Sequence, residues 1–332
     1  MADVPSPTVV YLDQLHWVEL SKIAHGKAAD SAGALELARR AVEQGVAVFP
    51  ISGGHFFELQ RISDVSRREK LGAQMWELSQ GRTLIDYGRL IQHEIASALR
   101  LFFPDRVPES SIQVLGRGIG HAFNKDATIP IPPKARERYS NGYLSRIQSG
   151  LQLEFERSLL TGYSELMKGS VPRVDLSAPA INFRRGLEKL RADLKNTNPD
   201  LRRRALEANA ILDIYDPLLV QLGKHGITWD EFAALGPDRW HDFLEAQPYR
   251  RLDLHLRNHL LTDRNLPIQD TDFNDWAFVG MGALYCDVVA TEKQFADILN
   301  RRGFEKRAVV YTRLSELAQH LSGMDHPARQ RS

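Results

Sequence analysis

Cysteine is almost absent from this chain of 332 residues, and Cys286 is the only one. A single thiol excludes an intrachain disulfide and a cysteine-based zinc cluster, so a buried, reduced side chain is the simplest interpretation. No apolar run is long enough to span a bilayer, and residues 1–7 lack the pattern of a signal peptide. We therefore expect a cytoplasmic protein that does not interact with a membrane.

The chain also lacks a net charge of one sign. Its formal net charge is +1, and its contents of 26% charged and 43% hydrophobic residues are ordinary for a globular protein. Nothing in this balance attracts nucleic acid to the whole surface, so any such binding face must be local. The glycine-rich residues 116–120 lack the Lys-Ser/Thr of a phosphate-binding loop and the spacing of a dinucleotide fingerprint, so they predict a turn.

One local excess of positive charge is present. Residues 184–204 contain eight basic residues against three acidic ones, and the run ends in Arg202, Arg203 and Arg204. One interpretation is a helix face that follows the phosphates of a nucleic acid. The other is a solvated helical hairpin of mixed charge.

The two ends of the chain alternate between strand and helix patterns. Residues 8–12 and 46–50 predict strands near the start, and residues 288–290 and 308–311 predict strands near the end. Between them, residues 82–250 have helical periodicity, including one long helix over residues 84–103. We therefore predict an α/β protein in which residues 8–80 and 265–318 are two halves of one three-layer α/β/α unit. Its small sheet is mainly parallel, and residues 82–250 are an α-helical insertion.

Carboxylates lie at the ends of these predicted elements. Asp13 ends the first strand, Glu58 lies in the helix after the second, Asp272 and Asp275 open a late helix, and Glu292 follows a strand. In an open parallel sheet, strand ends and the loops after them form the site. Several carboxylates in one place suggest a divalent cation. Each also has a plain structural interpretation, as a helix cap or an exposed surface residue.

This ordered set resembles the PIN-like nucleases, over residues 8–80 and 265–318. In that family an Asp ends the first strand, a Glu lies in the helix after the second, an Asp opens a late helix, and an acid follows a strand ending in Thr. The matching positions here are Asp13, Glu58, Asp275 (or Asp272) and Glu292. The usual last acid is an Asp two residues after the Thr, and Lys293 occupies that position.

The resemblance implies a metal-dependent nuclease, most consistent with an endoribonuclease that uses Mg²⁺ or Mn²⁺. Asp13, Glu58, Asp272, Asp275 and Glu292 are the metal-ligand candidates, and like charges so close should raise the pKa of at least one of them. RNA or single-stranded DNA is the expected partner, with an inhibitor or companion protein as a further candidate. Members of the family often act as toxins or in defence, a role that this sequence itself does not indicate.

Further assignments remain open at this level. Arg61, one turn after Glu58, could bind substrate phosphate or pair with Glu58. His16 and His55 could bind a ligand, although a satisfied, partly buried histidine is the simpler interpretation.

Two other functional classes compete with the nuclease. Because Lys293 replaces an acid, a non-catalytic PIN-like module that binds RNA or protein is the first. A phosphohydrolase with Asp13 as covalent nucleophile is the second, but that chemistry usually needs an acid where this chain has Leu15.

Overall fold

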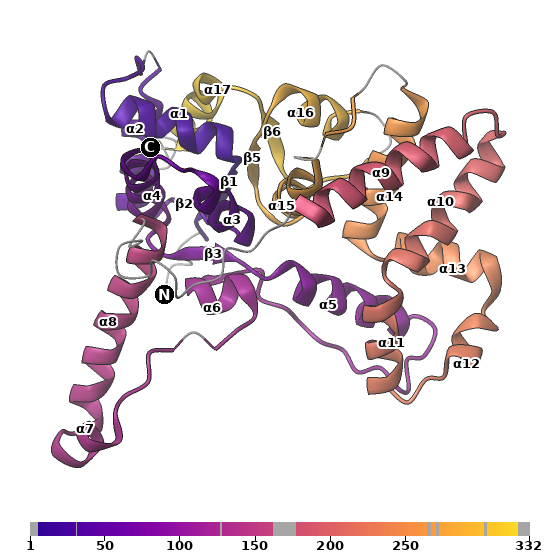
Figure 1. Ribbon diagram of the computed structural model, residues 1–332, viewed down its shortest axis with the longest axis horizontal. Coiled ribbons are helices and arrows are strands. Elements are labelled where there is room, and N and C mark those ends of the chain that lie inside the picture. Colours follow the sequence, from indigo (N-terminus) through magenta and orange to yellow (C-terminus); the bar gives the residue numbers. More distant parts are fainter. Residues whose placement is uncertain are drawn as a thin grey trace, which may run out of the picture.

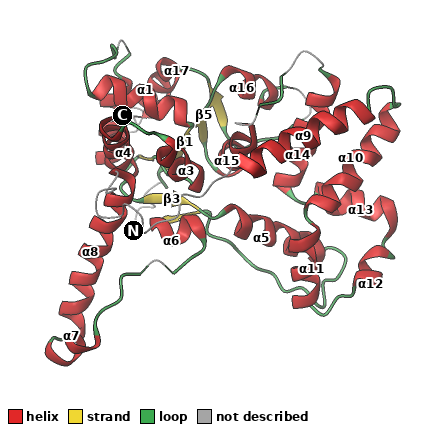
Figure 2. Cartoon of the chain, in the orientation of Figure 1, coloured by secondary structure: helices red, strands yellow, loops and turns green. Residues whose placement is uncertain are grey.

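A computed structural model describes residues 6–30, 32–126, 128–161, 177–263, 267–269, 272–301 and 304–324. Helices dominate this part of the chain, and its strands are short (Figures 1 and 2). None of its helices is both long and apolar enough to cross a membrane.

The elements at the two ends of the chain match the predicted alternation. The first part contains β1 (Thr8–Leu12), α1 (Gln14–Ala24), α2 (Ala34–Glu43), β2 (Ala47–Val48), α3 (Gly53–Arg61) and α4 (Val65–Ser79). The last part contains α15 (Asp272–Tyr285), β5 (Val288–Ala290), α16 (Lys293–Leu299), β6 (Val309–Tyr311) and α17 (Leu314–Met324).

The middle of the chain is mostly helical. It contains β3 (Arg82–Leu84), α5 (Tyr87–Arg100), β4 (Leu115–Arg117), α6 (Gly118–Phe123), α7 (Pro133–Arg138), α8 (Asn141–Thr161), α9 (Ser177–Asp193), α10 (Pro199–Asp213), α11 (Tyr215–Lys224), α12 (Trp229–Ala233), α13 (Gly236–Glu245) and α14 (Pro248–Thr262). In Figure 1, helices α9 to α14 lie together at one end of the molecule, and α7 and α8 extend away from the rest.

Strands from both ends of the chain form one sheet. Its order is β2-β1-β5-β6, and each neighbouring pair is parallel. In the register of the central pair, Val10 lies opposite Val288 and Leu12 opposite Ala290. The prediction that the two chain ends combine into one parallel sheet is therefore confirmed.

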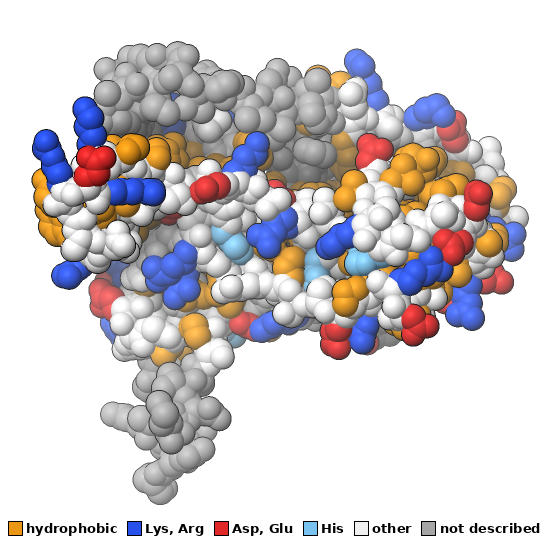
Figure 3. Space-filling model, turned by 90° about the horizontal axis from the view of Figure 1, so that it is seen from below, with side chains coloured by type: hydrophobic (Ala, Val, Ile, Leu, Met, Phe, Trp, Pro, Cys, Tyr) orange, Lys and Arg blue, Asp and Glu red, His pale blue; other side chains and the backbone are white. Residues whose placement is uncertain are grey.

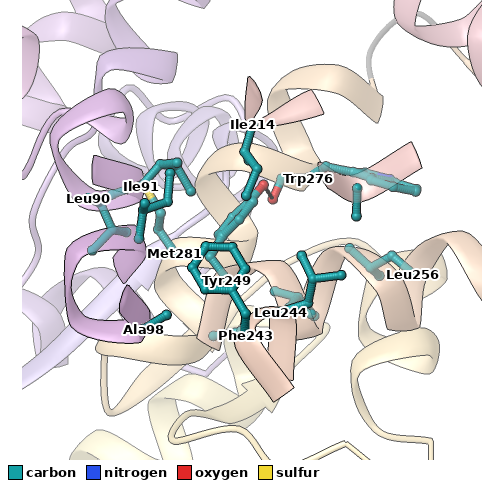
Figure 4. Close-up of a cluster of buried hydrophobic side chains, with 14 of the residues drawn as sticks. Leu90, Ile91, Ala98, Ile214, Phe243, Leu244, Tyr249, Leu256, Trp276 and Met281 are labelled. Carbon is teal, nitrogen blue, oxygen red and sulfur yellow. Dashed lines mark hydrogen bonds between the residues drawn. The ribbon is translucent and has the colours of Figure 1, made fainter. Parts of the chain in front are cut away.

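Helices cover both faces of this sheet, because neighbouring side chains along a strand point to opposite sides. Val10 and Leu12 belong to a core that includes residues of α1, α2, α4 and α17. Tyr11 and Val289 belong to a second core with residues of α5, α13, α14 and α15. Figure 4 shows part of the second core, where Leu90, Tyr249 and Met281 meet from three different helices.

The middle of the chain differs from its prediction in two places. Residues 82–84 and 115–117 pair as an antiparallel ribbon, with Thr83 opposite Gly116. The long helix predicted from residue 84 begins only at Tyr87, because Asp86 caps it by accepting a hydrogen bond from the N–H of Arg89 (2.9 Å). The predicted turn over residues 116–120 is wrong: β4 leads directly into α6, and Gly118 provides the positive φ of 79° at that junction.

Two glycines allow the elements around the sheet edge to approach closely. A Cβ at Gly282 of α15 would lie 2.8 Å from the ring of Tyr11 in β1. A Cβ at Gly54 of α3 would lie 2.4 Å from the ring of Phe278 in α15. Helix α15 therefore packs directly on the sheet, and α3 packs directly on α15.

Candidate functional site

The carboxyl ends of β1 and β5 lie side by side and hold Asp13 in a fixed orientation. The Asp13 N–H donates to the Ala290 carbonyl (2.9 Å). The Thr291 hydroxyl donates to Oδ2 of Asp13 (3.1 Å), and the Gln14 N–H donates to Oδ1 (2.5 Å). Asp13 therefore caps α1, as its structural interpretation predicts, and also presents its carboxylate at the sheet edge.

His55 attaches helix α3 to the same edge. Its Nδ1 accepts from the Ser52 N–H (2.9 Å), so Nε2 carries the proton and donates to the Leu12 carbonyl (2.9 Å). Burial lowers the pKa of His55 to about 4, which keeps the ring neutral. His55 is thus a structural residue, and it places Glu58, one turn later in α3, close to Asp13.

A pocket of about 380 Å³ opens at this edge. Its lining includes all four acids of the ordered set, Asp13, Glu58, Asp275 and Glu292. An adjoining smaller hollow is also lined by Asp13, Glu58 and Asp275, together with Tyr11. The acids come from the end of β1, from α3, from the first turn of α15 and from the residues after β5, so segments far apart in sequence share one pocket.

The charges of this pocket are incompletely compensated. Burial, followed by the charge of Asp13, raises the pKa of Glu58 to about 7, and nearby Arg61 only partly offsets this. Burial also raises the pKa of Asp13, against the hydrogen bond from Thr291. The pKa of Tyr11 is raised by its burial first, and by the charges of Asp13, Glu58 and Asp275. Crowded carboxylates do raise a pKa, as expected, but removal from water contributes more than charge repulsion.

Two arginines line the same pocket at exposed positions. Arg61 ends α3 and Arg67 lies in the first turn of α4. Arg61 was expected here from the sequence. Arg67 was not, because the break between α3 and α4 that brings it to the pocket left no clear signal in a run of charged residues.

The other predicted residues are not brought to this pocket. Asp272 begins α15, but its side chain lies outside the described part of the structure, so the choice between Asp272 and Asp275 stays open. Arg202, Arg203 and Arg204 lie on α10, away from the sheet (Figure 1). There Arg203 pairs with Asp200 and Glu207, and Arg204 also pairs with Asp200. On the face drawn in Figure 3, basic and acidic side chains are similarly interspersed.

The donor chemistry of the pocket fits a hard cation better than its spacing does. Carboxylate oxygens are the ligands that Mg²⁺ and Mn²⁺ prefer. Yet within the part of the chain that the structure describes, no three His, Cys, Asp or Glu side chains are grouped closely enough to hold a metal ion. The four acids share a pocket without converging on one point. Mg²⁺ commonly binds through only one or two carboxylates and keeps several waters, so an open arrangement is compatible with it.

Comparison of the chain with models of protein families, with curated proteins and with solved structures finds no match. The fold and the pocket therefore define the class: an α/β protein with a carboxylate-lined pocket at the carboxyl edge of a small parallel sheet. Any function must be argued from the residues of that pocket.

Proposed function

We propose that this protein is a metal-dependent nuclease of PIN-like type, an endoribonuclease that uses Mg²⁺ or Mn²⁺, with residues 82–250 as its helical insertion. One observation carries the proposal: the four acids that the family pattern selects in order, Asp13, Glu58, Asp275 and Glu292, line one pocket. They lie at the carboxyl edge of a parallel sheet, where sites of such folds form.

The residues of the pocket have distinct roles in this proposal. Asp13 and Glu58 hold the cation directly or through its waters, with Asp275 and Glu292 on the same wall. A bound divalent cation activates a water and neutralises charge on the scissile phosphate. Thr291 and the Gln14 N–H keep the Asp13 carboxylate oriented. Arg61 and Arg67, both exposed, bind phosphates on either side of the cleavage site.

The alternative is a non-catalytic PIN-like module that binds RNA or a protein partner. The loose spacing of the described acids favours it, as does Lys293 in place of a further acid. Metal-dependent cleavage distinguishes the two proposals, since only the first requires it.

The deciding experiment incubates the protein with pooled RNA and with single-stranded DNA, in Mg²⁺, in Mn²⁺ and in chelator. We expect cleavage of RNA with metal only, and a loss of at least about a hundredfold in Asp13→Asn, because Asn keeps the cap of α1 but lacks the charge that binds the cation. The matched control is Asp64→Asn, since Asp64 caps α4 by accepting from the Arg67 N–H (3.0 Å). Equal cleavage by Asp13→Asn and the unmodified chain would exclude this active site. Absence of cleavage under every condition would favour the non-catalytic module.

A further inference from the structure

A second, larger pocket lies beside the acidic one. Its volume of about 580 Å³ is within the range of sites for small molecules. Rings from several different segments line it: Phe57, Tyr87, Phe123, Phe183, Trp276 and Phe278. Such a lining offers flat apolar surfaces on several sides.

The two pockets are separated by the width of single residues. On α3, Phe57 lines the aromatic pocket and the next residue, Glu58, lines the acidic one. On α15, Trp276 lines the aromatic pocket and the preceding Asp275 lines the acidic one. Phe278 borders both the aromatic pocket and the small hollow beside Asp13. A ligand in one pocket is therefore adjacent to the contents of the other.

The polar part of the aromatic pocket contains one unsatisfied donor. Arg250 is only 5% exposed, and its Nη1 donates to Asp253 (2.7 Å). Among the described residues, its Nε has no hydrogen-bond partner. Arg257 is bound to Asp253 and Asp213 (3.0 and 2.6 Å). Because these arginines are balanced by carboxylates, the pocket suits a neutral planar group with a hydrogen-bond acceptor better than a phosphate.

We propose that the aromatic pocket binds an unpaired nucleobase of a single-stranded RNA, next to the phosphate held in the acidic pocket. This inference depends on the proposed function and names the part of the substrate that the neighbouring pocket holds. Every nucleobase has a π-face that stacks on aromatic side chains, and each has edge atoms that accept hydrogen bonds. The Nε of Arg250 supplies the matching donor. Duplex RNA hides its bases in the stack, so the pocket selects single strands and loops.

Helix α9 provides a way to fill this pocket without unfolding the protein. Asn182, Phe183, Gly186, Leu187 and Leu190 line it, at the spacing of one helix face. Gly186 is near the middle of that face, and a Cβ there would meet no atom within 4 Å. Gly186→Phe therefore adds a side chain on the pocket wall and replaces a poor helix former.

A matched control is available on α11. Gly223 also has open space around a Cβ, and it lies outside the lining of both pockets. Gly223→Phe makes the same chemical change to a helix, so thermal unfolding should show both variants at least as stable as the unmodified chain.

The test measures binding by fluorescence anisotropy of a labelled short single-stranded RNA, with chelator present so that no cleavage occurs. Stacking of a base contributes enough that Gly186→Phe should weaken binding about tenfold to a hundredfold, while Gly223→Phe binds as the unmodified chain does. RNAs with one abasic nucleotide at successive positions locate the bound base: one of them should bind the unmodified chain more weakly by a similar factor and bind Gly186→Phe no worse than intact RNA does.

Equal binding by Gly186→Phe and Gly223→Phe, equal binding of all abasic RNAs, or no RNA binding at all would overturn the base-pocket inference. RNA binding that responds to Gly186→Phe without any metal-dependent cleavage would support the base pocket and exclude only the nuclease. Cleavage that is lost in Asp13→Asn but unaffected by Gly186→Phe would have the opposite meaning.

Discussion

Buried carboxylates occur in two contrasting settings in this molecule. Asp253 in the helical part lies between Arg250 and Arg257, at 2.7 and 3.0 Å. Burial alone would raise its pKa, but Arg257 and Arg250 outweigh this and lower it. At the sheet edge, burial raises the pKa of Glu58 to about 7, and Arg61 does not restore it. The helical part neutralises its own charges, whereas the sheet edge leaves charge to be neutralised by a proton or a bound cation.

A third buried carboxylate shows that a raised pKa alone does not identify a site. Burial raises the pKa of Glu94 to about 7 as well. Its oxygens accept from the Tyr249 N–H (2.8 Å) and from the Tyr285 hydroxyl, within the core of the helical part. Glu58, in contrast, lines an open pocket that also contains other acids. Perturbed groups gathered in a pocket suggest function, whereas a satisfied one in a core suggests structure.

The largest effect on stability should come from breaking the compensated setting. Asp253→Asn leaves Arg250 and Arg257 buried without their shared counter-charge, so we expect a loss of about 3–5 kcal/mol in the free energy of unfolding. Asp200→Asn is the control, because Asp200 is exposed and its ion pairs with two arginines contribute little. Urea unfolding of both variants measures the difference. Similar losses in the two would contradict a structural role for the buried ion pairs.

The opposite sign is expected for Glu58→Gln. The unfolded chain ionises Glu58 near its ordinary pKa of 4.5 and the folded one near 7, so between these pH values only the folded state holds the proton. Stability must then fall as pH rises from about 4.5 to 7, by at most about 3 kcal/mol for this group. Glu58→Gln should remove that part of the slope, and so make the protein more stable than the unmodified chain at pH 8 but not at pH 4.

Glu94→Gln separates this effect from general burial. Glu94 should add a similar slope of its own, because its pKa is also raised to about 7. Saturating Mn²⁺ should recover stability at pH 8 through Glu58, since a nearby cation lowers a carboxylate pKa, and should leave the contribution of Glu94 unchanged. Thermal unfolding at several pH values, with and without Mn²⁺, resolves the two. A metal response that persists in Glu58→Gln would remove Glu58 from the set of ligands.

The sheet edge was largely predictable because its signals are local. A β-rich run that ends in Asp13, and another that ends before Thr291, fix two strand ends, and parallel pairing brings them together. The helical part was less predictable. Periodicity extended the predicted helix through Leu84, where pairing between β3 and β4 determines the structure instead. The ion pairs of Asp253 could not be assigned either, because three charged residues on one helix face are usually solvated.

The smallest effects compare the two sets of exposed arginines. If α10 follows phosphates, replacing Arg202, Arg203 and Arg204 together with Ala should reduce the salt dependence of RNA binding by about two units of slope, at roughly 0.7 per phosphate contact. Arg203 and Arg204 are already paired with Asp200 on α10, so we expect a much smaller change. Replacing Arg61 and Arg67, which line the acidic pocket, should lower the slope by about one unit and weaken binding. Titrations of labelled single-stranded RNA at several salt concentrations give both slopes. A larger decrease for the α10 variant would mean that RNA crosses the helical part, and that the local pairing on α10 yields to phosphate.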